Sequence, residues 1–310
     1  MKKFGAIFAG QGSQSIGMGK YFYDNSQTAK EMFERASDAI KVDMKALLFE
    51  DETKLAQSEF TQPAILLVSA IANQLFTEAC SLAPQFALGH SLGEFSALTS
   101  VGAFSLENAI KTVHNRGLWM QEACVGKEAS MMVVLGLSDE KAEEAVTQAQ
   151  KEGKLVWAAN YNCDGQLGLA GKKSDLEPMT AILKEAGAKR AMLLNMSVAS
   201  HCPMLESAKK PLAELLNETL TDDFSSSVIS NVTGKAYNSK KEALSLLPDQ
   251  LVKPVLYKQS VIENSSDLDL FIEFGHGAVL KGINKKVTKV TTLSVNNMDS
   301  LDVALKEMGV

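Results

Sequence analysis

Short apolar runs alternate with amphipathic segments through the first third of the chain. The expected strands cover residues 4–9 and 86–88, and the expected helices cover residues 61–79, 93–100 and 106–124. Strands that alternate with helices favour a parallel sheet that is covered by helices on both faces. The sequence therefore predicts an α/β fold with a mostly parallel sheet.

A different pattern follows Gly126. The expected elements there are a strand at 129–135, a helix at 138–151, strands at 155–160 and 166–170, a helix at 174–186 and a strand at 190–196. This β-α-β-β-α-β order is typical of a small ferredoxin-like domain. With 310 residues the chain has room for two domains. We expect a large domain made of residues 1–126 and 199–310, interrupted by a small domain at 127–198.

The composition excludes several classes of protein. A formal net charge of −6 disfavours non-specific binding to nucleic acid. No apolar stretch is long enough to cross a bilayer. The four cysteines show neither a C-x-x-C pair nor a histidine at zinc spacing. We therefore expect a soluble, cytoplasmic enzyme with reduced thiols, no metal site, and neither a membrane nor a nucleic acid as partner.

The sharpest local motif is Gly-His-Ser-Leu-Gly at residues 89–93, between an expected strand and an expected helix. A nucleophile elbow requires this context, because the strained turn lifts the serine hydroxyl clear of the sheet. The N-terminus of the following helix would also favour negative charge near Ser91. The alternative is a serine that only caps the helix.

A serine nucleophile needs a base within hydrogen-bonding distance. Of the four histidines, His90 is adjacent to Ser91 and must point elsewhere, and His114 lies in the middle of a helix. His201 and His276 both follow expected strands, where catalytic groups are common. Spacing alone does not choose between these two.

Arg116 lies beside the apolar stripe of its helix. A guanidinium on the buried side of a helix needs an anion, because it cannot lose its charge by deprotonation. Its planar fork matches a carboxylate. Either the carboxylate of a ligand or an internal salt bridge to Asp or Glu would satisfy it.

The segment 10–14 reads Gly-Gln-Gly-Ser-Gln and follows the first expected strand. It fits neither phosphate-binding motif, because Ser15 replaces the last glycine of G-x-G-x-x-G and Met18 stands where a Walker A loop needs lysine. Such a loop can instead supply backbone N–H groups to an oxyanion hole.

Seven short motifs occur in order along nearly the whole chain: 10–14, 89–94, 116–117 with 120–121, 160–162, 170–171, 200–201 and 275–277. Together they closely resemble the malonyl-CoA:acyl-carrier-protein transacylases. The resemblance implies an α/β-hydrolase-like large domain interrupted by a ferredoxin-like one. It also implies transfer of malonyl from malonyl-CoA to the phosphopantetheine thiol of acyl carrier protein, through a malonyl-serine, for fatty acid synthesis. No permanently bound cofactor is expected.

The resemblance gives a role to each matching residue. Ser91 would be the nucleophile and His201 its general base and acid. The backbone N–H groups of Gln11 and Leu92 would form the oxyanion hole. Arg116 would bind the free carboxylate of the malonyl group.

Further roles follow from the same resemblance. In this family a main-chain carbonyl orients the histidine, and Leu256 stands where a glutamine is usual, so Leu256 is expected to supply that carbonyl. Asn160, Asn162 and His90 are expected to line the cleft. His276, where the family often has proline, is expected to be structural.

The acyl carrier protein expected as partner is strongly acidic, and basic residues of this chain cluster in two places. We expect one or both clusters to steer the carrier protein to the cleft of a monomeric enzyme. The first cluster includes Lys189 and Arg190, and the second, at roughly helical spacing, includes Lys281, Lys285 and Lys286. The alternative is a solvated basic surface without a partner.

Three other functions compete with this one. A serine thioesterase or esterase would use the same serine and histidine, but it has no need for a buried Arg116, and its Asp or Glu triad member is hard to place. A non-catalytic or differently loaded acyltransferase module is disfavoured by the length of the chain. A nucleotide-binding regulator lacks both phosphate-binding motifs.

Overall fold

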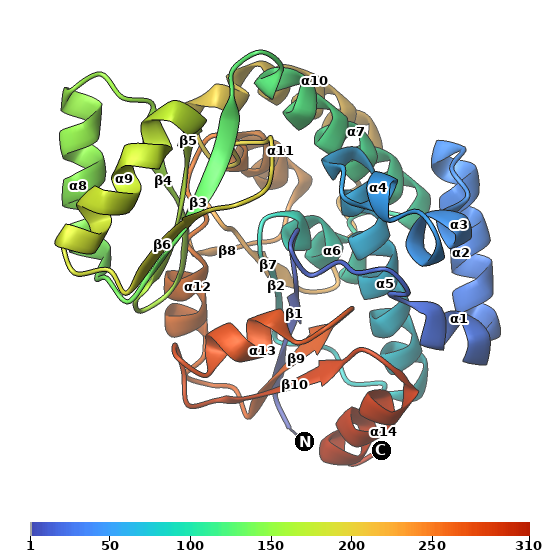
Figure 1. Cartoon of the computed structure of the whole chain (residues 1–310). Helices are drawn as coiled ribbons and strands as arrows, with labels where there is room; N and C mark the ends of the chain where they lie inside the picture. Colours follow the sequence, from blue (N-terminus) through green and yellow to red (C-terminus); the bar gives the residue numbers. More distant parts are fainter. Residues whose placement is uncertain (1) are drawn as a thin grey trace.

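A computed structural model describes residues 2–310, and a six-stranded sheet forms its centre (Figure 1). Its strands are β1 (Phe4–Phe8), β2 (Phe86–Gly89), β7 (Ser227–Ile229), β8 (Ala236–Tyr237), β9 (Leu270–Phe274) and β10 (Thr291–Val295). Their order is β10-β9-β1-β2-β7-β8. All neighbours pair in parallel except β7 and β8. The predicted mostly parallel α/β sheet is confirmed.

The large sheet is covered by helices on both faces (Figure 1). Phe8 belongs to an apolar cluster with α5 and α6, whereas its neighbour Ile7 belongs to a cluster with α12 and α13 on the opposite face. The helices on and around this sheet are α1 (Lys20–Asn25), α2 (Gln27–Ile40), α3 (Met44–Phe49), α4 (Glu52–Leu55), α5 (Ser58–Ala79), α6 (Leu92–Ser100), α7 (Leu106–Cys124), α10 (Glu206–Thr219), α11 (Lys240–Gln250), α12 (Tyr257–Asn264), α13 (Val279–Asn284) and α14 (Met298–Met308), with a 3₁₀ turn at Pro203–Leu205.

A second, antiparallel sheet lies beside the first and carries two helices of its own (Figure 1). Its elements are β3 (Ala129–Leu135), α8 (Asp139–Lys151), β4 (Val156–Cys163), β5 (Gln166–Lys172), α9 (Lys173–Glu185) and β6 (Arg190–Leu193). The strand order β4-β5-β3-β6 and the β-α-β-β-α-β sequence confirm the ferredoxin-like prediction. Strand β6 ends earlier than the expected residue 196. The division of the chain at residues 126 and 198 stays a prediction.

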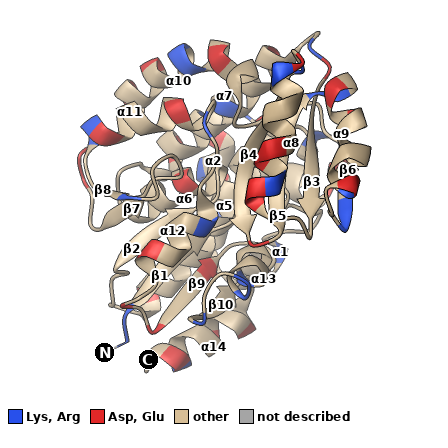
Figure 2. Ribbon diagram, turned by 90° about the vertical axis from the view of Figure 1, so that its left-hand side faces the viewer, with Lys and Arg blue, Asp and Glu red and all other residues tan. Residues whose placement is uncertain are grey.

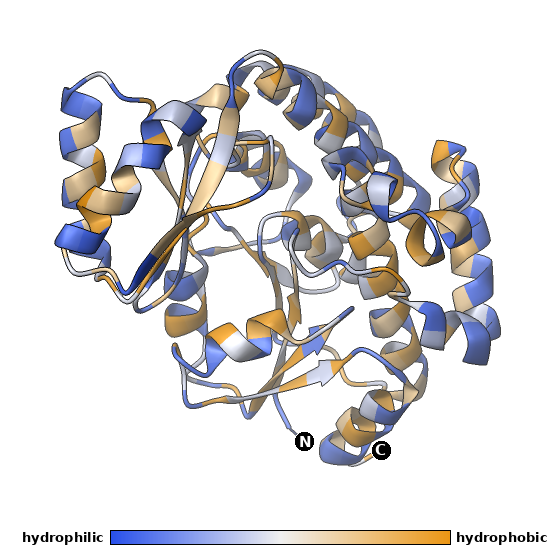
Figure 3. Cartoon of the chain, in the orientation of Figure 1, coloured by the Kyte–Doolittle hydropathy of each residue, from blue (hydrophilic) through white to orange (hydrophobic). Residues whose placement is uncertain are grey.

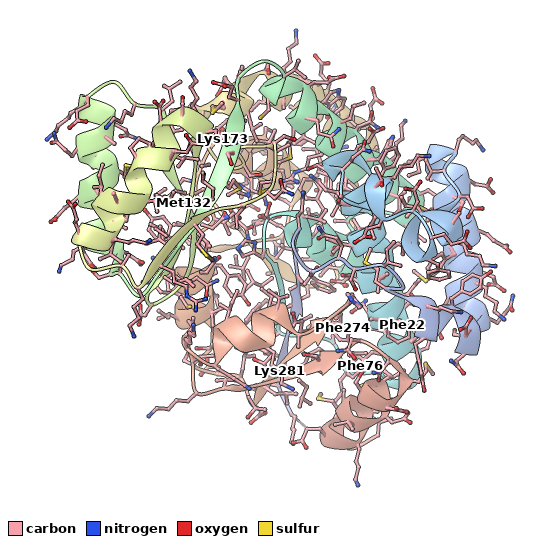
Figure 4. All side chains as sticks on the ribbon, in the orientation of Figure 1. Phe22, Phe76, Met132, Lys173, Phe274 and Lys281 are labelled. Atoms are coloured by element: carbon pink, nitrogen blue, oxygen red, sulfur yellow. The ribbon has the colours of Figure 1, made fainter. Side chains whose placement is uncertain are left out.

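Aromatic side chains fill the core between the large sheet and α5. The rings of Phe8 and Phe274 stack at 5.7 Å between centroids, and Phe76 meets Phe274 edge-on at 5.3 Å. Figure 4 shows Phe76 and Phe274 side by side in the lower half of the molecule. In Figure 3 the outer helices turn hydrophilic residues outward. Each buried ring contributes about 1.5–3 kcal/mol through burial of its apolar surface.

The two sheets are joined next to the carboxyl ends of the large sheet's strands. Tyr161 N–H donates to the Val255 carbonyl, and Val255 N–H donates to the Ala159 carbonyl, each at 2.9 Å. His90 Nε2 lies 2.8 Å from Asn162 Oδ1. These bonds fix the small sheet against the loop that carries Ser91.

Features typical of membrane spans and of metal sites are absent from residues 2–310. None of the helices there combines the length and the apolar character needed to span a membrane. The same residues hold no group of three or more side chains placed to ligate a metal ion. All four cysteines are buried and free.

Candidate active site

Ser91 lies on the sharp turn that joins β2 to α6. Its φ of 54° is in the left-handed region, which is strained for a residue with a side chain. The turn needs glycine on both sides. A Cβ on Gly89 would lie 1.7 Å from the carbonyl carbon of Gly93, and a Cβ on Gly93 would lie 2.0 Å from the carbonyl oxygen of Phe8. The motif therefore forms a nucleophile elbow, pressed directly against the end of β1.

The hydroxyl of Ser91 contacts a base and a cation. Its Oγ lies 2.8 Å from His201 Nε2 and accepts a hydrogen bond from Arg116 Nη2 at 3.2 Å. Ser91 is the N-cap residue of α6, yet its side chain makes no capping bond. The helix-capping interpretation is therefore wrong. The hydroxyl is instead placed for proton transfer to an imidazole.

His201 is held in one tautomer by a main-chain carbonyl. Its side chain is buried, and its Nδ1 lies 2.7 Å from the carbonyl oxygen of Gln250. Because a carbonyl only accepts, Nδ1 carries the proton and Nε2 is free to accept the proton of Ser91. Burial, reinforced by the charge of Arg116, lowers the pKa of His201 to about 3. The imidazole is therefore neutral at physiological pH, as a general base must be.

The structure corrects the expected partner of this histidine. The carbonyl is that of Gln250, the last residue of α11, and not that of Leu256. The end of a helix leaves carbonyl groups without intrahelical donors, so Gln250 is free to accept. The carbonyl of Leu256 instead accepts from Ser260 within α12. His276 lies elsewhere, with Nε2 2.7 Å from the hydroxyl of Ser15.

Arg116 is 1% exposed, and within residues 2–310 none of its hydrogen-bond partners is acidic. Its Nη1 donates to Gln62 Oε1 at 2.7 Å and its Nη2 donates to Gln250 Oε1 at 3.0 Å. The guanidinium lies over the ring of Phe95, 5.1 Å from its centroid. Its Nε is buried without a partner among the described residues. The expected alternative of an internal salt bridge is wrong, since amide oxygens occupy those places.

A fully buried carboxyl group behind the elbow was not anticipated. Glu94 accepts hydrogen bonds from Gln250 Nε2 at 2.6 Å, from the Tyr237 hydroxyl at 2.9 Å and from the Asn231 N–H at 3.1 Å. Burial raises the pKa of Glu94 to about 7. Asn231 in turn accepts from the N–H of Ser91 at 2.6 Å. This network links the elbow to the residue that orients His201.

The loop after β1 packs against the elbow. A Cβ on Gly10 would lie 2.2 Å from the carbonyl oxygen of His90, so the two turns touch. Gln11 follows Gly10, and Leu92 follows the serine at the start of α6. Neither the N–H of Gln11 nor that of Leu92 finds an acceptor among residues 2–310. Both donors stay available for a ligand oxygen.

The three residues expected to line the cleft lie at the junction of the sheets. His90 and Asn162 bond to each other there, and burial lowers the pKa of His90. Asn160 is 8% exposed, and its Oδ1 has no partner in the described part of the chain. That these side chains contact a substrate stays a prediction.

A cavity of about 910 Å³ lies between the start of α5, the end of α7 and the small sheet, and no residue of the elbow is among those that line it. Gln11 and Ser58 lie at its inner side, and Gln11 Nε2 donates to Ser58 Oγ at 3.0 Å. Lys173, labelled in Figure 4, lines it from the small-sheet side.

The two basic clusters lie outside the cavity. Lys189 and Arg190 are exposed at the start of β6, and Lys285 and Lys286 are exposed after α13. The expected helical spacing of the second cluster is wrong, because α13 ends at Asn284 and contains only Lys281 of that set. Figure 2 shows that charges of both signs are mixed over the outer helices.

Fold and site together define a class of protein. A serine on a nucleophile elbow above a parallel sheet, hydrogen-bonded to an oriented histidine, is the arrangement of α/β enzymes that work through a serine. Residues 6–304 match the sequence model of the family described as "Acyl transferase domain". The chain is an acyltransferase.

Relatives identify the family within that class. The chain is 35% identical over 311 residues to the malonyl CoA-acyl carrier protein transacylase of Bacillus subtilis (strain 168), covering 99% of this chain and 98% of the relative. A crystal structure of malonyl-CoA:acyl carrier protein transacylase from Helicobacter pylori superposes with a TM-score of 0.96 at 49% identity, covering 100% of this chain and 99% of that one. A malonyl-transacylase in complex with its type II PKS acyl-carrier protein gives a TM-score of 0.94 at 33% identity, covering 98% and 99%. The chain belongs to the malonyl CoA-acyl carrier protein transacylase family.

Proposed function

We propose that this chain transfers the malonyl group from malonyl-CoA to the phosphopantetheine thiol of an acyl carrier protein, and so supplies malonyl units for fatty acid synthesis. One observation supports the choice of malonyl above all others. Arg116 is buried without an acidic side chain in contact, and its Nη2 lies 3.2 Å from Ser91 Oγ. An acyl group on that serine which ends in a carboxylate would supply the missing negative charge.

In the first half-reaction, His201 Nε2 takes the proton of Ser91 as the hydroxyl oxygen attacks the thioester carbonyl of malonyl-CoA. Negative charge develops on the carbonyl oxygen, and the N–H groups of Gln11 and Leu92 stabilise it. Each such donor contributes about 3 kcal/mol. The carbon–sulfur bond then breaks, and CoA leaves as a thiol with the proton from His201. A malonyl ester stays on Ser91.

In the second half-reaction, the phosphopantetheine thiol takes the place of CoA. His201 removes the thiol proton as the sulfur attacks the ester, and it returns that proton to Ser91 when the carbon–oxygen bond breaks. CoA leaves before the carrier protein reacts, so the kinetics are ping-pong. The chemistry needs no permanently bound cofactor.

Arg116 gives selectivity through its charge. In the free enzyme its Nη2 donates to Ser91 Oγ, and the malonyl carboxylate replaces that contact after acylation. An acetyl group has no carboxylate, so the buried cation stays unpaired and acetyl transfer loses this stabilisation.

The acceptor in this proposal is an acidic acyl carrier protein, and the enzyme acts as a monomer in the cytoplasm. The related malonyl-transacylase in complex with an acyl-carrier protein supports this partner. The exposed cluster of Lys189 and Arg190 and that of Lys285 and Lys286 are the candidates for docking. Lys281 is half-buried and contributes less.

Intact-protein mass after brief mixing with malonyl-CoA or acetyl-CoA tests the proposal. We expect a malonyl-sized increment with malonyl-CoA and little or none with acetyl-CoA. In Ser91→Ala the increment is absent. Holo carrier protein added next should remove the malonyl-sized increment from the enzyme, and the mass of the carrier protein should rise by the same amount. Steady release of free malonate and CoA without a carrier protein would instead identify a serine thioesterase.

A further inference from the structure

The direct partners of Arg116 are neutral, although the guanidinium is buried. Gln62 Oε1 and Gln250 Oε1 accept from Nη1 and Nη2, and no carboxylate lies within salt-bridge distance in the described part of the chain. We propose that Gln62 determines the acyl specificity of this enzyme: its neutral amide fixes the guanidinium of Arg116 without placing a negative charge beside it, so that the carboxylate of the acyl group can pair with the guanidinium. This inference rests on the function proposed above.

The close approach of α5 and α7 brings Gln62 to Arg116. A Cβ on Gly117 would lie 2.3 Å from the carbonyl oxygen of Ser58, so only glycine lets the two helices meet there. Gly117 is the residue after Arg116, and Ser58 begins α5 one turn before Gln62. Gln121 Oε1, one turn further along α7, accepts from the N–H of Glu59 at 3.0 Å. The register between the helices is therefore fixed at this point.

A proline and a histidine secure the same register. Pro63 follows Gln62 inside α5 and has no N–H, so the carbonyl of Glu59 lacks its intrahelical donor. His114 Nδ1, on the neighbouring helix, lies 3.1 Å from that carbonyl oxygen. His114 is two residues before Arg116. The helix-interior histidine thus has a structural partner, and its bond holds the backbone next to Gln62 against the backbone next to Arg116.

The orientation of the Gln62 amide follows from its surroundings. The side chain is fully buried, with Oε1 2.7 Å from Arg116 Nη1 and Nε2 3.4 Å from Met120 Sδ. A flipped amide would place its NH₂ against the N–H groups of the guanidinium, donor against donor. Gln62 therefore acts on Arg116 as an acceptor with a partial negative charge and no net charge.

Gln62 and Gln250 differ in their other hydrogen-bond partners. Gln250 also bonds to Glu94, to the carbonyl of Ser91 and, through its backbone, to His201. A change there would disturb the base and the elbow together. Among residues 2–310 the amide of Gln62 makes hydrogen bonds only to Arg116 and Met120. A substitution at residue 62 therefore tests the charge of Arg116 separately from the reacting hydroxyl and imidazole.

Glutamine and glutamate have nearly the same shape, so Gln62→Glu changes charge alone. A carboxylate in this place would form a buried ion pair with Arg116. The carboxylate of an incoming malonyl group would then be repelled by the carboxylate introduced at residue 62 and would find Arg116 already paired. An acetyl group has no charge, so its binding would change little. Because the amide of Gln62 is neutral, the positive charge of Arg116 can pair with the carboxylate of the substrate.

The experiment measures acylation of the enzyme by malonyl-CoA and by acetyl-CoA in wild type, Gln62→Glu and Gln62→Met. We expect Gln62→Glu to lower kcat/KM for malonyl-CoA by about 100-fold, mainly through KM, and to change that for acetyl-CoA by less than threefold. Gln62→Met keeps the charge of Arg116 but loses its acceptor. We expect it to raise KM for malonyl-CoA by only about tenfold. Circular dichroism and thermal unfolding check that each variant is folded.

Several results would overturn the proposal. A malonyl-to-acetyl ratio within threefold of wild type in Gln62→Glu shows that charge at residue 62 does not set specificity. An equal loss in Gln62→Met and Gln62→Glu assigns the effect to geometry. If Gln62→Glu does not fold, an unchanged KM for malonyl-CoA in Gln62→Met has the same meaning. A wild-type enzyme that takes no malonyl group rejects the proposed function itself, which keeps the two failures distinct.

Discussion

Arg116 and Lys258 are both largely buried cations, but the partners of one are neutral and the partners of the other are acidic. Arg116, beside Ser91, is held by two neutral amides. Lys258, on α12, has a side chain that is 15% exposed and contacts two carboxylates of the ferredoxin-like part, Asp139 and Asp164. The first cation belongs to the candidate site, and the second joins the two sheets. The cation that joins the two sheets is paired with carboxylates, whereas the cation that we propose binds a ligand is held by neutral amides.

The pKa values follow the same contrast. Burial lowers the pKa of Arg116 to about 10, and the charge of Glu94 offsets this only in part. Burial also acts to lower the pKa of Lys258, but the bonds to Asp139 and Asp164 outweigh it, and the pKa is raised. The guanidinium thus stays charged at physiological pH because arginine is so basic, not because a local carboxylate holds its proton. Lysine is less basic than arginine, so a lysine buried in the place of Arg116 would be less fully charged at physiological pH.

The largest expected effect is that of Arg116→Ala. If this cation serves the substrate, its removal should lower kcat/KM for malonyl-CoA by about 1000-fold, equivalent to about 4 kcal/mol. Acylation by acetyl-CoA should fall far less, because no charge pair is lost. Rates of adduct formation measured by intact mass for both donors check this. Equal losses for the two donors would mean that Arg116 supports the serine or the fold rather than a carboxylate.

The next effect concerns Glu94, which shares the partner Gln250 with Arg116. Glu94 is fully buried, and its pKa is raised to about 7, well above the value of a carboxyl group in an unfolded chain. The folded protein therefore binds more protons than the unfolded chain between about pH 4.5 and 7. By linkage, this group makes the protein less stable as the pH rises through that window, by at most about 3 kcal/mol.

Glu94→Gln tests this dependence. The variant has no titrating group at that position, so the difference in unfolding free energy between wild type and variant should move against wild type as pH rises from about 4.5 to 7, and then level off. Urea unfolding at a series of pH values measures it. A difference that is constant with pH would show that Glu94 is already ionised at pH 5, and that Arg116 has a full counter-charge one amide away.

Local features of this protein could be predicted from sequence, and long-range partners could not. The strand, turn and helix around Ser91 are predicted correctly because glycines 89 and 93 constrain the backbone over five residues. Gln62 and Gln250, in contrast, meet Arg116 across 54 and 134 residues of chain. Nothing in their neighbourhoods marks them, since a buried glutamine has no periodic or motif signal of its own.

The error at Leu256 has the same origin. A backbone carbonyl is present at every residue, so only the position of a helix end decides which one is free. Helix α11 ends at Gln250, six residues before the expected place. The roughly helical spacing of the second basic cluster does not correspond to one helix for a related reason, because α13 ends at Asn284 before most of its lysines. Element ends are determined by packing that the sequence does not display.

The smallest effect is expected at the structural cation. Lys258→Met would leave Asp139, whose side chain is 12% exposed, without its partner, and should lower the free energy of unfolding by about 2 kcal/mol. The malonyl-to-acetyl ratio should stay within twofold of wild type, because Lys258 bonds to no residue of the elbow. Lys253→Met is the matched control, since Lys253 pairs with Asp249 on the surface and is 52% exposed, so its loss should cost less than about 0.5 kcal/mol. Urea unfolding and acylation by both donors measure the two properties in the same samples. A change of acyl preference in Lys258→Met would mean that the position of the small sheet, and not only the charge state of Arg116, determines which acyl group is accepted.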